Sequence, residues 1–301
     1  MTARAAGTPT ARRVSVRRSA VIRQIRDIES VRLELERSRA YAAYPLAYLD
    51  KRMFGLAEFY EATAGDRRAL VMHARGGLGP STFSLGDASL VGTLLSLHPG
   101  PRQAFFTCES EHVERILTTH NVWRPQTMLR MQLTREDFRP PADLSGVRRL
   151  IAADAVDLNR LYNEESTRYT GRQIIEGVYF GAHHRGWLVA AAGTHIYSRR
   201  EGVAVIGNVF THPDFRGHGL GSATTAAVAT HLLQDCDLVV LNVDPANRTA
   251  RHIYEQMGFK ETGRLIEAMA TRRQAYSPLP FVRRTLARHR STQPETELVE
   301  L

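Results

Sequence analysis

The sequence has few cysteines, very little lysine and no long apolar run. Its 301 residues include only two cysteines, Cys108 and Cys236, which lie far apart and form no Cys-x-x-Cys pair. This spacing excludes a disulfide framework and indicates reduced thiols, so we expect a cytoplasmic protein. No apolar run approaches the ~20 residues that span a bilayer, and no membrane partner is expected. The N-terminus lacks the apolar core of a secretory signal.

Nearly all positive charge comes from arginine, because lysine occurs only as Lys51 and Lys260. The net charge of +9 favours an acidic or neutral substrate over a positively charged one such as a polyamine. Residues 1–19 are rich in Arg, Ala and Thr and are predicted to form a disordered basic tail. A solvated tail is the simpler interpretation of this segment, so nucleic acid is not an expected partner. A homodimer is left open.

The most informative stretch is 203–259. The apolar run 203–210 predicts a buried strand, a short turn follows, and a glycine-rich segment opens into a helix over 222–233. A second apolar strand, 238–243, precedes a helix over 247–257 that Gly258 ends. Free backbone N–H groups at a helix start, with glycines that allow close approach, form a site for phosphate.

Two kinds of phosphate site fit this order. Gly217 and Gly219 begin a dinucleotide-binding pattern, and Asp244 ends the next strand where an acid would bind ribose. Ser222 stands where the third glycine would be, and Arg216 has no place in that pattern.

The same stretch resembles the GNAT superfamily of N-acyltransferases. The family's phosphate loop, (Gln or Arg)-x-x-Gly-x-(Gly or Ala), is matched by RGHGLG at 216–221. A second block, Asn-x-x-Ala-x-x-x-Tyr-x-x-x-Gly-Phe, follows after one helix and one strand. It is matched by Asn247, Ala250, Tyr254, Gly258 and Phe259. The resemblance extends loosely over 147–270.

The resemblance implies acetyl-CoA as acyl donor and a set of contacts for it. The backbone at the end of the strand 203–210 would pair with pantetheine, and the loop amides would hold the pyrophosphate. Tyr254 would be catalytic, protonating the departing thiolate. The residues expected to contact coenzyme A are Val209, Phe210, Thr211, Arg216, Gly217, His218, Gly219, Leu220, Gly221, Ser222, Asn242 and Asn247.

The residues themselves agree with an amine attacking a thioester. This reaction needs a neutral amine, a stabilised oxyanion and a proton for sulfur. A backbone N–H at the end of the strand 203–210 is suited to the oxyanion, and a phenol to the proton. The expected activity is N-acetyl transfer to an unidentified amine in a ternary complex. The alternatives are a non-catalytic acyl-CoA sensor and an NAD-dependent oxidoreductase.

Neither a general base nor a metal site can be identified. Glu164, Glu176 and His212 are weak candidates for the base. His183 and His195 lack further ligands at a suitable spacing, so no metal is expected.

The expected fold class is α/β (α+β), with a GNAT-like, mixed and mostly antiparallel sheet flanked by helices. We predict an N-terminal domain over 20–139, a proline-rich linker, an acyltransferase domain over 144–273 and a polar, partly disordered tail over 274–301.

In the N-terminal part, apolar spacing predicts helices over 21–41 and 47–62 and a strand over 70–74. Beyond residue 86, helices over 87–97 and 111–120 alternate with strands over 103–108 and 126–133. This order of strands and helices resembles the order in the C-terminal unit. The N-terminal part is therefore interpreted as a degenerate relative that lacks the arginine-glycine turn and does not bind coenzyme A.

Overall fold

The computed structural model describes residues 19–76, 79–163, 168–273, 278–290 and 296–301. The basic tail, apart from Ser19, and Glu164 lie outside these ranges. None of the described helices is long and apolar enough to cross a membrane.

The described strands form one sheet of 13, in the order β13-β1-β2-β3-β4-β5-β12-β6-β11-β10-β9-β8-β7. Its pairs are antiparallel except for β4 with β5 and β10 with β11. The strands of the N-terminal half, with β13, are β1 Ser19–Ile25, β2 Ala57–Ala64, β3 Arg67–Ala74, β4 Ser81–Gly86, β5 Gln103–Cys108, β6 His120–Leu133 and β13 Thr296–Glu300. The remaining strands are β7 Val147–Arg149, β8 Tyr179–His184, β9 Trp187–Ser198, β10 Val203–Thr211, β11 Leu238–Val243 and β12 Lys260–Arg272.

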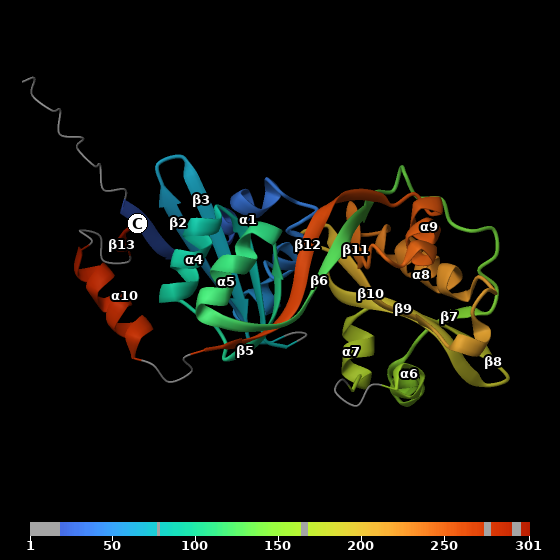
Figure 1. Cartoon of the computed structure of the whole chain (residues 1–301). Helices are drawn as coiled ribbons and strands as arrows, with labels where there is room; N and C mark the ends of the chain where they lie inside the picture. The colour runs from blue at the N-terminus through green and yellow to red at the C-terminus, as the bar shows by residue number, and fades with distance from the viewer. Residues whose placement is uncertain (1–18, 77–78, 164–167, 274–277, 291–295) are drawn as a thin grey trace, which may run out of the picture.

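Helices flank this sheet (Figure 1). The α-helices are α1 Ile28–Glu36, α2 Ala43–Ala47, α3 Lys51–Phe54, α4 Ala88–Leu97, α5 Val113–Thr119, α6 Ala155–Tyr162, α7 Gly171–Glu176, α8 Leu220–Leu232, α9 Arg248–Gln256 and α10 Leu279–Arg290. Short 3-10 turns are η1 Ser110–His112, η2 Ala152–Asp154 and η3 Pro213–Phe215.

The two halves repeat one order of elements. The unit β4-α4-β5-α5-β6 corresponds to β10-α8-β11-α9-β12, and each unit starts with its parallel strand pair. The last strand of each unit pairs with the other unit, because β6 lies beside β11 and β12 lies beside β5. These two long strands also pair with each other and cross the middle of the molecule (Figure 1). The halves therefore share a continuous sheet, although the linker expected after residue 139 follows β6.

Two expected helices near the N-terminus are wrong in the structure. Residues 19–25 are a strand in which Ala20 and Ile22 are buried and Val21 is 40% exposed, an alternation of period two. The helix α1 begins only after Asp27, whose carboxylate accepts from the Ser30 amide at 2.9 Å. The helix expected over 47–62 is instead α2, α3 and the strand β2.

The expectation of a partly disordered C-terminal tail is wrong for residues 279–290 and 296–300. The first range is the helix α10, and the second is the strand β13, which pairs antiparallel with β1. Glu297 on β13 is 4% exposed and accepts a hydrogen bond from Arg288 of α10 at 3.2 Å. Strand pairing and this polar contact place the end of the chain against its beginning.

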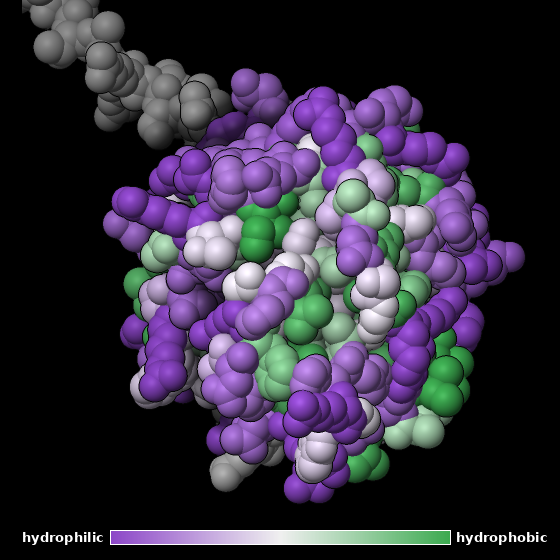
Figure 2. All heavy atoms as spheres, turned by 90° about the vertical axis from the view of Figure 1, so that its right-hand side faces the viewer, coloured by the Kyte–Doolittle hydropathy of each residue, from purple (hydrophilic) through white to green (hydrophobic). Residues whose placement is uncertain are grey.

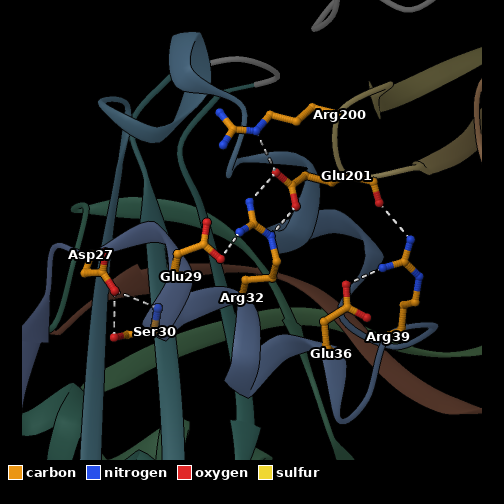
Figure 3. Close-up of polar contacts among 8 residues, drawn as sticks. All are labelled: Asp27, Glu29, Ser30, Arg32, Glu36, Arg39, Arg200 and Glu201. Atoms are coloured by element: carbon orange, nitrogen blue, oxygen red, sulfur yellow. Dashed lines mark hydrogen bonds and ion pairs between the residues drawn. The ribbon is translucent and has the colours of Figure 1, made fainter.

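An ion-pair network ties the N-terminal helix α1 to the β9–β10 turn of the C-terminal half (Figure 3). Arg32 donates two hydrogen bonds to the Glu201 carboxylate, at 2.7 and 2.8 Å, and also pairs with Glu29. Arg39 donates to the Glu201 backbone carbonyl at 2.7 Å and pairs with Glu36. The Glu201 side chain is only 3% exposed, so its charge depends on this partner.

Replacing Arg32 by Ala is expected to lower the free energy of unfolding by about 3 kcal/mol, because it leaves the buried Glu201 carboxylate with the longer 3.6 Å contact to Arg200 in place of two short hydrogen bonds. Chemical denaturation measures the change. Arg37→Ala, at the C-terminal cap of the same helix, is the control, since Arg37 is 61% exposed and pairs with Glu34 at 3.3 Å. That variant should lose less than about 0.5 kcal/mol. Equal losses in the two variants would contradict a structural role for the network.

Candidate functional site

A cavity of about 660 Å³ lies where the end of β10, the start of α8 and one face of α9 meet. It is lined by Val209, Phe210, Thr211, Phe215, Arg216, Gly217, Gly219, Leu220, Gly221, Ser222, Asn247, Thr249, Ala250, Ile253 and Tyr254. Figure 2 views the end of the molecule that carries α8 and α9, where hydrophobic residues gather within a hydrophilic border. The cavity thus brings together the glycine-rich loop and the asparagine–tyrosine helix.

The cavity exists because β10 and β11 separate. Their parallel pairing runs from Val203 with Leu238 to Ile206 with Leu241 and goes no further in the described residues. Beyond it, β10 bulges between Gly207 and Phe210. Backbone groups of β10 past the bulge have no described strand as a neighbour on the α9 side, so those that no side chain occupies can pair with an extended ligand.

The bulge is held from outside the sheet. Asn208 has a positive φ of 53°, an uncommon conformation for a residue other than glycine. Tyr162 of α6 donates its hydroxyl to the Asn208 carbonyl, and Tyr162 also packs edge-on against Phe210 at 5.9 Å. The helix α6 therefore positions the end of β10.

The loop before α8 presents open amides. Gly217 and Gly219 have φ values of 79° and 74°, which favour glycine, and a Cβ on either would meet no atom within 4 Å. The first described hydrogen bond into α8 runs from the Ala223 amide to the Gly219 carbonyl at 2.9 Å. The amides of residues 220–222 precede it and lack a partner within the helix. Their positive helix end faces the cavity.

Two side chains of the loop differ in their surroundings. Arg216 lines the cavity, and its Nε donates to the Thr211 carbonyl at 3.2 Å, which joins the loop to the end of β10. His218 is exposed and is not among the lining residues; its Nδ1 lies 2.9 Å from the Arg216 carbonyl oxygen. The expected contact of His218 with a ligand is thus limited to its backbone.

The helix α9 supplies Asn247 and Tyr254. Asn247 caps the helix by accepting from the Ala250 amide at 3.0 Å and also lines the cavity. After α9 the chain turns at Gly258, where φ is 96° and a Cβ would lie 1.9 Å from the Asp137 carbonyl oxygen. No other residue fits there, and the turn fixes the helix that carries Tyr254.

Tyr254 is 7% exposed and lies against Phe259 with ring centroids 5.8 Å apart. Its hydroxyl has no hydrogen bond to any described side chain or backbone group, although the residue lines the cavity. Burial raises its pKa to about 12. The phenol therefore stays protonated near neutral pH and is free to donate.

Sequence reasoning did not include Phe215, Thr249 and Ile253 among the site residues. Thr249 and Ile253 stand four residues apart on α9, beside Asn247 and Tyr254, so helical spacing could have identified both. Asn242, expected to contact the cofactor, is not among the lining residues. It donates to Glu267 of β12 at 2.6 Å instead.

Two of the three candidates for a base, Glu176 and His212, are described, and both are at least partly exposed. Glu176 pairs with Arg172 and Arg52 on α7 and α3, and the Arg172 hydrogen bond holds its pKa below the usual range. His212 caps η3 and does not line the cavity. Within the described ranges, no group of three or more His, Cys, Asp or Glu side chains could hold a metal ion.

The N-terminal half has no matching phosphate loop. Its equivalent helix α4 begins at Asp87, whose carboxylate accepts from the amides of Ser89 and Leu90, each at 3.0 Å. A carboxylate at the helix start takes the place that a phosphate would need and repels it. The start of α4 therefore differs from the start of α8, where the amides are open.

Comparison with known proteins identifies the family of part of the C-terminal half. Residues 148–259 match the model of the acetyltransferase (GNAT) family. Mycothiol acetyltransferase from Thermobispora bispora is 40% identical over 86 residues, which cover 27% of this chain and 29% of that protein's own length. The match thus spans under a third of the relative.

Solved structures resemble much more of the chain. A Drosophila protein has a TM-score of 0.62 at 15% identity, covering 83% of this chain and 98% of its own. A tandem GNAT protein from the clavulanic acid biosynthesis pathway has a TM-score of 0.50 at 15% identity, covering 84% and 98%. A putative GNAT acetyltransferase from Novosphingobium aromaticivorans has a TM-score of 0.51 at 19% identity, covering 67% and 88%. These likenesses concern the fold.

The mixed, mostly antiparallel fold expected from the sequence is confirmed, and the two halves together form a tandem GNAT-like fold. The family match covers the strand–loop–helix unit that builds the cavity. Residues 148–259 of this chain are a GNAT acetyltransferase domain.

Proposed function

We propose that this chain is an N-acetyltransferase that moves the acetyl group of acetyl-CoA to an amine, the donor being the one that the GNAT family uses. The observation that carries the proposal is the cavity itself. It joins open amides at a helix start to an unpaired, protonated phenol across one continuous space.

The pyrophosphate of the donor fits the loop end of this cavity. Amides of residues 217–222, the helix dipole and Arg216 provide donors and positive charge there. The pantetheine arm carries amide groups and extends naturally beside the unpaired end of β10, as an added strand would. This path leads the sulfur from the loop towards Tyr254.

The reaction then proceeds by direct attack. The neutral amine nitrogen forms a bond to the thioester carbonyl carbon, whose electrons move onto oxygen. A backbone N–H at the end of β10 stabilises this oxyanion, a contribution of about 3 kcal/mol in comparable sites. As the C–S bond breaks, Tyr254 gives its proton to sulfur, and the proton that leaves the nitrogen replaces it through solvent. Burial raises the pKa of Tyr254, and the same surroundings raise the pKa of a coenzyme A thiol beside it. Proton transfer from the phenol to the sulfur therefore remains feasible.

Thiol release from acetyl-CoA, measured with a panel of primary amines, tests the proposal. The panel should include an amino acid, an amino sugar, a peptide with a free α-amine and a polyamine. Thiol release that depends on one of these amines, with an acetylated product seen by mass spectrometry, is expected. Tight coenzyme A binding without turnover on any amine would instead favour a sensor, and stabilisation by NAD but not by coenzyme A would favour an oxidoreductase.

A further inference from the structure

A second polar group of residues lies across the sheet from the cavity. It consists of Arg130 on β6, Asn242 on β11 and Glu267 on β12, and we call it the Glu267 cluster. Leu241 belongs to the same hydrophobic core as Tyr254, whereas Val240 belongs to the core formed with α1 and α2. Because side chains alternate along a strand, Asn242 points to the face of Val240.

The Glu267 cluster lies beside the opening in the sheet. Asn242 directly follows Leu241, the last residue of β11 that pairs with β10. Past this pair no backbone pairing between β10 and β11 is described. The cluster therefore lies beside the point where the two strands separate, on the face opposite the coenzyme A cavity, and does not line that cavity.

Several atoms in the cluster are buried without a partner. Arg130 is 2% exposed, and neither its Nε nor its Nη1 has a hydrogen bond to the described residues. Its Nη2 donates to the Tyr41 carbonyl at 3.4 Å, and burial lowers its pKa to about 10. The Oδ1 of Asn242 is also unpaired among the described residues. Buried polar atoms normally find protein, water or a ligand, so this group has capacity for another polar molecule.

Glu267 is half-buried and accepts from Asn242 at 2.6 Å. Burial raises the pKa of its carboxyl, while the Asn242 hydrogen bond and the charge of Arg130 act in the opposite direction. A carboxylate with a raised pKa is a stronger proton acceptor than a surface one. Asn242 thus orients Glu267, and the charge of Arg130 favours its ionised form.

His195 of β9 lies near Arg130 on the same face of the sheet. Its side chain is solvent-accessible, yet the surrounding protein and the charge of Arg130 lower its pKa to about 4. The imidazole lies over Gly207, where a Cβ would be 2.0 Å from Nε2. Gly207 borders the β10 bulge, so His195 and the Glu267 cluster lie near the same opening.

From this placement we infer that Glu267 is the general base of the reaction and that a primary amine acceptor enters from the face of the Glu267 cluster. This inference rests on the proposed acetyl transfer. An alkylammonium carries three N–H protons and the amide product one. Glu267 takes the first proton before attack and releases it to solvent. The second leaves the nitrogen as the adduct collapses and returns through solvent to Tyr254, which has given its own proton to sulfur. The N-terminal half thereby contributes Arg130 to the acceptor side.

Glu267→Gln tests the base, because the amide keeps the size of the side chain and can still accept from Asn242. With the best amine of the panel, kcat/KM near neutral pH is expected to fall about a hundredfold or more. The loss should shrink above the pKa of the amine, about 10 for a lysine-like group, since the amine then arrives neutral. Coenzyme A affinity should not change.

Glu261→Gln is the matched control, since Glu261 is exposed on the same strand and should not affect turnover. An unchanged rate for Glu267→Gln, or a loss that is the same at every pH, would overturn the assignment of the base alone. A wild-type chain that transfers to no amine would overturn the proposed function and the base with it.

The position of the acetyl group in a complex with acetyl-CoA gives a readout that needs no turnover and no variant. The expected result is a carbonyl carbon facing the Glu267 carboxylate, with room for one amine nitrogen, or an amine and a water, between them. An acetyl group enclosed on the α8–α9 side would overturn the inference even if the chain proves to be active.

Discussion

Replacing Tyr254 by Phe is expected to lower kcat about a hundredfold, the contribution typical of a positioned general acid, while coenzyme A affinity is retained. The ring that packs against Phe259 remains, so the helix α9 and the cavity wall should stay in place. Only the hydroxyl is lost, and it has no hydrogen bond to the described residues that would stabilise the fold. Steady-state kinetics with saturating donor, together with calorimetric titration of coenzyme A, measure both quantities.

Tyr197→Phe serves as the control for removal of a phenol in the same domain. Tyr197 is half-buried on β9, and its hydroxyl accepts from Arg199 at the surface, away from the cavity. That variant should transfer acetyl groups at the wild-type rate. If Tyr254→Phe does so as well, Tyr254 has no part in the chemistry and its match to the family block reflects packing alone.

Replacing Gly219 by Val is expected to weaken coenzyme A binding about a hundredfold. A branched side chain is strained at a φ of 74°, and the new atoms would occupy the open space in front of the loop amides. Each lost hydrogen bond to a charged phosphate contributes about 1.5–3 kcal/mol, so the loss of one or two accounts for the effect. Titration calorimetry measures the affinity.

The variant Gly186→Val is the control for the effect of backbone strain alone. Gly186 lies in the β8–β9 turn with a φ of 85° and no atom within 4 Å of a built Cβ, as at Gly219. This variant should lose a similar amount of thermal stability and bind coenzyme A normally. Undiminished binding by Gly219→Val would contradict the assignment of the phosphate loop.

Local patterns identified most of the C-terminal unit. The apolar run of β11 and that of β5 were predicted over the same residues that the structure shows. Asn247 caps α9 as its residue type and position predict. These elements could be predicted because apolar periodicity, helix caps and glycine turns depend on only a few neighbouring residues. The motif of the phosphate loop is local in the same way.

Features that depend on distant parts of the chain were not predictable. Val21, Ile25 and Ile28 fit a helical period, but pairing of β1 with β2 and β13 determines a strand as far as Ile25. The pairing of β6 with β11 and of β12 with β5, each with a strand of the other half, also has no local signal, because it depends on contacts between distant parts of the chain. The contact of Asn242 with Glu267 follows from that pairing between the halves, so Glu267 could not be identified from the sequence as a candidate base.

A crystal structure of the chain with acetyl-CoA tests the central claim most directly. The predicted result is a diphosphate bound by the backbone amides of residues 217–222 beside Arg216, with the thioester sulfur within hydrogen-bonding distance of the Tyr254 hydroxyl. A diphosphate bound elsewhere, or a sulfur remote from Tyr254, would contradict it.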